Sequence, residues 1–262
     1  ARADGFDHRA LELRESILPS PTGDPMFDRW PADLDSRAPG DVIATRDVTA
    51  AAGPVVTVPL RSATLIEFRS TDAVGAPIFG TATLLVPRRT ARAPTPMLVN
   101  NLPIDSLGAA CTPGYTLAHG FSIATGVTDL IPPTTQLALH EGYAVLVPDH
   151  QGPRMAYAEP VLAGHVILDA VRAALHVRPE LLRRSRIAMT GYSGGAIATH
   201  GAAKLLGEYA PELTDRVVGA GLGGAWVTMR WSDAGSGGIA RALFSAVSGS
   251  GETVALAEEM LR

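Results

Sequence analysis

The sequence contains a single cysteine, Cys111, so no disulfide can form between two residues of this chain. Charged residues make up 18% of it and the formal net charge is -4, which leaves no basic surface for a nucleic acid or an anionic membrane. No uninterrupted apolar stretch approaches the roughly 20 residues that a membrane-spanning helix needs. These shortages exclude an internal disulfide scaffold, and we expect no nucleic-acid partner.

Apolar residues are abundant, at 46% of the 262 positions. That share is ordinary for a globular protein, and the length is enough for one large domain or at most two modest ones. The first fifty residues are rich in Pro and Asp ("ILPSPTGDPMFDRWPADLDSRAPGD"), a composition that favours an irregular arm over regular structure. We therefore expect an N-terminal arm over residues 1–50, followed by a folded core over residues 51–224.

The core shows strand patterns first and then an alternation of strands with helices. Residues 63–71 alternate apolar and polar side chains, and residues 77–87 form an apolar run bounded by prolines. Short continuous apolar runs, typical of strands buried on both faces, then follow at 96–100, 143–148, 186–190 and 216–222. Between the second and third of them, residues 163–177 place apolar side chains at helical spacing. This order predicts an α/β fold with a mainly parallel sheet flanked by helices.

A serine enclosed by glycines lies where one of these strands meets a helix. The stretch "RIAMTGYSGGAIATHGAAKLL" joins a buried strand to a run of strong helix formers, and Gly191, Ser193 and Gly195 at the junction spell G-x-S-x-G. In this context the motif indicates a nucleophile elbow, because glycines two positions either side permit the sharp turn that exposes the serine. The alternative is a glycine-rich turn that cradles phosphate, but neither G-x-G-x-x-G nor a P-loop Gly-Lys-Ser/Thr occurs here.

Several stretches together resemble one enzyme family. They occur in the order "APGDVIATRDV", "NNLPIDSLGAACTPGY", "EGYAVLVPDHQG", "TGYSGGAIAT" and "YAPEL" followed by "VVGAGLGG". In order and spacing these are similar to the secretory lipases, which are α/β-hydrolases acting on carboxylic esters. The resemblance runs from about residue 25 to the end of the chain.

The resemblance implies a secreted or cell-envelope enzyme that uses no metal and no cofactor and acts on a small-molecule or lipid ester. Residue by residue it implies Ser193 as the nucleophile, with Gly194 and Asp105 as the two donors of the oxyanion hole. It also implies a Ser-Asp-His triad and a helical cap after the strand at 216–222. Residues 225–262 would begin that cap. Helical spacing places Leu243 on an apolar face there, which would either border the acyl site and contact lipid-like substrates or pack on the core.

The position of Asp105 agrees with this role. Asp105 follows the strand at 96–100, which lies beside the strand of Ser193 in the sheet order that the resemblance implies. Neighbouring strands are about 4.8 Å apart, so the turn after one can face the elbow at the end of the next. The alternative is an aspartate that merely closes a turn.

The histidines of the chain fit poorly as a base for Ser193. His150 would end a strand two positions from that of Ser193, and His200 lies seven residues along the helix, so each is expected about 10 Å away. His165 and His176 look like boundary residues of a helix, and Asp149 like part of a structural D-x-x-G turn.

The sequence therefore shows a deficit in the triad. In α/β-hydrolases the acid and then the histidine follow the serine along the chain, yet no histidine occurs after His200. We expect the acid and base on a C-terminal segment or a second chain, outside these 262 residues. The competing hypothesis is a non-catalytic binding protein or an inactive fragment on the same scaffold, because fold alone does not decide function.

Overall fold

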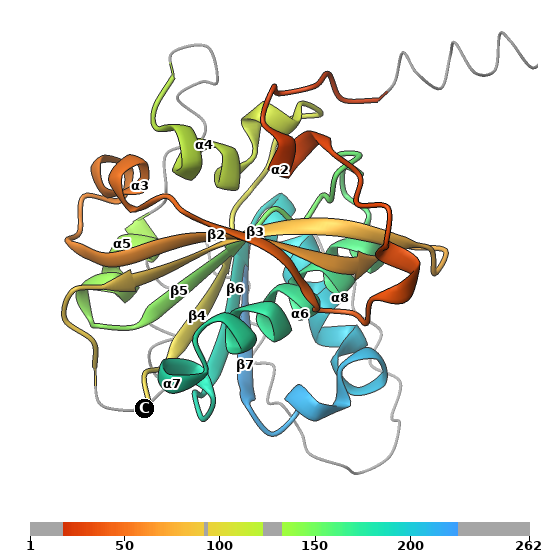
Figure 1. Ribbon diagram of the computed structural model, residues 1–262. Helices are drawn as coiled ribbons and strands as arrows, with labels where there is room; N and C mark the ends of the chain where they lie inside the picture. Colours follow the sequence, from red (N-terminus) through yellow and green to blue (C-terminus); the bar gives the residue numbers. More distant parts are fainter. Residues whose placement is uncertain (1–17, 92–93, 123–132, 225–262) are drawn as a thin grey trace, which may run out of the picture.

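The computed structural model describes residues 18–91, 94–122 and 133–224. A sheet of seven strands forms its centre, with helices on both faces (Figure 1). The strands are β1 (Val42–Asp47), β2 (Leu60–Thr71), β3 (Pro77–Pro87), β4 (Met97–Asn101), β5 (Ala144–Pro148), β6 (Ile187–Tyr192) and β7 (Val217–Gly223). The helices are α2 (Pro25–Asp28), α3 (Thr49–Val56), α4 (Pro113–His119), α5 (Pro133–His140), α6 (Pro160–Val177), α7 (Pro179–Leu182) and α8 (Gly194–Tyr209).

The strand order is β1-β2-β3-β5-β4-β6-β7. The pairs β5-β4, β4-β6 and β6-β7 are parallel, whereas β1-β2, β2-β3 and β3-β5 are antiparallel. Strands β2, β4, β5, β6 and β7 therefore run in one direction, and β1 and β3 run in the other. This arrangement confirms the predicted mainly parallel sheet, and it places the ends of β4, β5 and β6 at one edge.

The N-terminal region differs from the prediction of an irregular arm. Residues 42–47 form β1, which pairs with β2 at the edge of the sheet, and α2 begins where the Asp24 carboxylate accepts a hydrogen bond from the backbone N–H of Met26. The side chains of β1 are half-buried or exposed, so this strand lacks the apolar run that marks the inner strands. Pro39, Gly40 and Asp41 directly before it further weaken its signal in the sequence.

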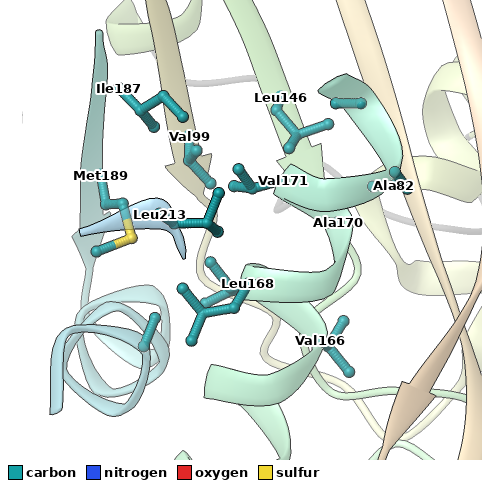
Figure 2. Packing of buried hydrophobic residues seen from close by; sticks show 14 of the residues in the cluster. Ala82, Val99, Leu146, Val166, Leu168, Ala170, Val171, Ile187, Met189 and Leu213 are labelled. Atoms are coloured by element: carbon teal, nitrogen blue, oxygen red, sulfur yellow. The ribbon is translucent and has the colours of Figure 1, made fainter. Parts of the chain in front are cut away.

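Each face of the sheet carries its own hydrophobic core. On one face, α6 and α8 pack on the inner strands, and Figure 2 shows Val171 of α6 beside Val99 of β4 and Leu146 of β5. On the other face, the core takes in buried residues of α3, α4 and α5. Helix α6 is long and apolar enough to cross a membrane by length and composition alone, but 61% of it is buried inside the protein. It is the central helix of the first core.

Candidate active site

Ser193 stands at the tip of a tight turn between β6 and α8. Its backbone adopts φ 54° and ψ -121°, a conformation that L-residues rarely adopt, and it is the N-cap residue of α8. The Ser193 N–H donates to the carbonyl of Gly223 in the next strand at 2.9 Å. A non-glycine residue held at positive φ by its neighbours is typical of functional sites.

The flanking glycines are required because the chain packs against itself here. A β-carbon on Gly191 would overlap the backbone of Gly195, and one on Gly195 would overlap the carbonyl of Asn101 at the end of β4. Both glycines thus allow β6, α8 and β4 to meet at the turn. The reason that the sequence suggested for the motif is confirmed.

The expected oxyanion donors lie on adjacent segments of chain. Gly194 is the first residue of α8, so its N–H has no acceptor within the helix. The backbone nitrogen of Ile104 lies 4.0 Å from where a β-carbon on Gly194 would be. Asp105 follows directly in the chain, and its side chain is exposed. The loop after β4 therefore passes beside the first turn of α8, as the predicted strand order requires.

A cavity of about 240 Å³ opens in front of the serine. Ser193 and Gly194 line it from the elbow, and His150, Gln151 and Glu159 line it from the segment after β5. Asp105 is not among the residues that line this cavity. The Glu159 carboxylate is already engaged, because it caps α6 by accepting from the backbone N–H groups of Val161 at 3.2 Å and Leu162 at 2.5 Å.

His150 lines the same cavity as Ser193, but its ring is buried and hydrogen-bonded to the loop after β4. It is 3% exposed, and its Nε2 is 2.8 Å from the carbonyl oxygen of Leu102. Burial lowers the pKa of His150 to about 4, although the hydrogen bond to Leu102 opposes this effect. The ring is thus neutral near pH 7: Nε2–H donates to Leu102 and Nδ1 is left as an acceptor, but a ring whose pKa is this low is a weak base for the serine proton.

The other candidates take structural roles. Asp149 accepts from the N–H of Gly114 at 2.8 Å and from the Thr81 hydroxyl at 2.6 Å, and its carbonyl closes the D-x-x-G turn by accepting from Gly152. His165 lies against Tyr209, with ring centroids 4.1 Å apart. Burial lowers the pKa of half-buried His200, and the charge of Lys204 adds to this effect. Among the described residues no histidine hydrogen-bonds to Ser193.

Other features of the described residues bear on cofactors and partners. In the described parts of the chain no group of three or more His, Cys, Asp and Glu residues could hold a metal ion, and Cys111 is a free, half-buried thiol. The predicted cap over 225–262, with Leu243, lies outside the described residues.

The sequence missed Gln151, whose amide nitrogen donates to the carbonyl of Ile104 at 2.6 Å, because no motif marks it.

Comparisons with known proteins bear on the family and the fold. Residues 120–231 match the family model described as secretory lipase. A protein of Mycobacterium tuberculosis named a probable inactive lipase is 36% identical over 214 residues, which cover 81% of this chain and 47% of that protein. A secreted triacylglycerol lipase of Malassezia furfur is 33% identical over 222 residues, which cover 82% of this chain and 45% of that lipase.

The crystal structure of Candida antarctica lipase A in its closed state superposes with a TM-score of 0.68 at 31% identity. The match covers 79% of this chain and 47% of that one. The fold is thus that of the α/β-hydrolases. The chain spans about half the length of the relatives that it matches.

Proposed function

We propose that this chain, which belongs to the secretory lipase family, supplies the nucleophile and the oxyanion hole of a serine esterase. The observation that carries the proposal is the strained turn at Ser193, which presents a hydroxyl beside the free N–H of the first residue of α8. Strain of this kind costs about 1–3 kcal/mol, and it is retained where exposure of the side chain is needed.

The reaction follows from the positions of these groups. The Ser193 oxygen attacks the ester carbonyl while a base removes its proton, and the N–H groups of Gly194 and Asp105 stabilise the resulting oxyanion. Collapse of the tetrahedral intermediate expels the alcohol, which takes up that proton. Water then attacks the acyl-enzyme in the same way and releases the carboxylic acid.

The acid and base of the triad would come from outside residues 1–262, on a C-terminal segment or a second chain. His150 lines the cavity of Ser193, but burial lowers its pKa to about 4, which makes it a weak base, and no hydrogen bond joins it to Ser193 among the described residues. In other α/β-hydrolases the acid and histidine follow the nucleophile along the chain.

The proposed substrates are lipid esters, since several relatives are named triacylglycerol lipases. We further propose that the protein is secreted, or held at the cell envelope. These finer statements follow from the family and from the names of its members.

The second candidate is a catalytically inactive protein on the same scaffold. It is favoured by one observation, the relative that is named a probable inactive lipase. Such a protein would keep the fold and the cavity but would lack turnover.

Covalent labelling of the natural full-length protein distinguishes the two. An organophosphonate ester should add to Ser193, and Ser193→Ala should abolish the hydrolysis of p-nitrophenyl esters. Ser36→Ala, at an exposed serine that does not line the cavity, should leave the hydrolysis unchanged. Peptide mass spectrometry identifies the labelled serine. Labelling at a different serine, with turnover surviving Ser193→Ala, would overturn the assignment, and a folded protein with neither labelling nor turnover would support the inactive alternative.

A further inference from the structure

The segment after β5 holds the segment after β4 through two side chains. The Nε2 of His150 is 2.8 Å from the carbonyl oxygen of Leu102, and the amide nitrogen of Gln151 donates to the carbonyl oxygen of Ile104 at 2.6 Å. Both side chains are 3% exposed. Two consecutive buried residues thus bind alternate carbonyls of the loop that leads to Asp105.

Apolar packing holds the same two segments together. Met155, buried and at φ 52°, forms a small hydrophobic cluster with Ile104 and Ala109. The loop 102–105 is therefore held from one side by residues 150–155, while its Ile104 nitrogen lies close to Gly194.

The chemistry of Gln151 gives its hydrogen bond a direction. A carbonyl can only accept, so the Gln151 amide must present its nitrogen, and not its oxygen, to Ile104. The carbonyl of Ile104 and the N–H of Asp105 belong to one planar peptide unit, and in the trans form they point in opposite directions. A hydrogen bond that holds the carbonyl therefore also fixes the direction of the Asp105 N–H.

We propose that Gln151, assisted by His150, is a positioning residue that fixes the Ile104–Asp105 peptide unit, so that the Asp105 N–H is aimed as an oxyanion donor. This inference rests on the proposed function, because it takes Ser193 as the nucleophile and the Asp105 N–H as a donor. Without the hydrogen bond from Gln151, the peptide unit can rotate and turn its carbonyl toward the developing oxyanion.

Two variants of the full-length enzyme test this role. Gln151→Met keeps the length of the side chain and removes the donor, and Gln151→Glu places a carboxylate against the Ile104 carbonyl. Each should lower kcat about 100-fold, the cost of losing one oxyanion donor, and leave KM within about twofold. His150→Phe, which acts two peptide units further away, should lower kcat about tenfold.

The matched control is Gln136→Glu on α5. The Gln136 side-chain oxygen accepts from the Thr57 hydroxyl at 2.8 Å, a bond that a carboxylate can also accept, so kcat should not change. All rates are expressed per active site titrated with the phosphonate, so that a fraction of unfolded protein does not lower them.

A thionoester analogue separates positioning from general damage. Its sulfur fits an oxyanion hole poorly, so an intact hole prefers the oxygen ester, and the oxygen-to-sulfur rate ratio should fall about tenfold or more in Gln151→Met and Gln151→Glu. If these variants keep the wild-type kcat, or lose kcat with an unchanged ratio, the positioning role is refuted, while labelling at Ser193 in the wild type still upholds the proposed function. If the wild type itself is not labelled at Ser193, the proposed function fails first.

Discussion

Replacing Gly195 with alanine tests whether close packing of α8 against β4 builds the elbow. A β-carbon at this position would lie 2.7 Å from the carbonyl carbon of Asn101 and 3.1 Å from that of Leu102, whereas ordinary contact begins at 3.4 Å. The helix and the strand must therefore separate by at least 0.7 Å, and more at the Asn101 oxygen. Both partners are backbone atoms, so no side chain can rotate out of the way.

The magnitude follows from two opposing effects. Overpacking of this kind costs about 1–3 kcal/mol, and its upper end applies to rigid backbone. Alanine in place of glycine within a helix stabilises the fold by about 0.5–1 kcal/mol, which offsets part of this loss. We expect a net loss of about 2 kcal/mol in the free energy of unfolding. A displacement near 1 Å at the nucleophile should also lower kcat about 100-fold.

Gly207 on the same helix is the matched control. No atom lies within 4 Å of a β-carbon there, so Gly207→Ala should raise the free energy of unfolding by about 0.5 kcal/mol and leave kcat unchanged. Urea unfolding followed by circular dichroism, together with p-nitrophenyl ester hydrolysis, measures both variants in the full-length protein. If Gly195→Ala is as stable and as active as Gly207→Ala, the packing argument is wrong.

Two further experiments test buried charged groups of the core. Burial raises the pKa of Glu67 to about 7, although Arg29 and Arg37 oppose this shift. Because the folded protein holds this proton more tightly than the unfolded chain, the free energy of unfolding should fall by about 3 kcal/mol as the pH rises from about 4.5 to 7. Urea unfolding of Glu67→Gln should lack this dependence on pH. Arg172 donates to the fully buried Asp169 at 2.7 Å, so Arg172→Met should lower the free energy of unfolding by about 3–5 kcal/mol. Adding Asp169→Asn should restore part of this stability, because the double variant has no unpaired buried charge. If the stability of Glu67→Gln varies with pH as the wild type does, the expectation for Glu67 is wrong. If Arg172→Met loses no more stability than Arg183→Met, a change at an exposed arginine, the expectation for Arg172 is wrong.

The sequence by itself determined the elbow and the inner strands. The turn at the elbow depends on five residues, so the motif of Gly191, Ser193 and Gly195 is enough to predict it. The apolar runs that form β4 to β7 indicate strands buried on both faces. Such signals are local, because backbone sterics and burial act on neighbouring residues. The edge strand β1 was not predicted, because its side chains are half-buried or exposed and form no continuous apolar run. The roles of Asp105 and Gly194 came from resemblance to a family and stay predictions.

The tertiary structure decided which distant groups meet at the serine. Nothing in the residues around His150 and Gln151 shows that they reach the carbonyls of Leu102 and Ile104, since these contacts join positions 48 and 47 residues apart. They exist because the sheet order places β5 beside β4, and β4 beside β6. The sequence predicted the nucleophile, but only the packing of the strands brought the segment after β5 against the loop that faces it. Strand order results from the best burial of the whole chain, which no short stretch of sequence records.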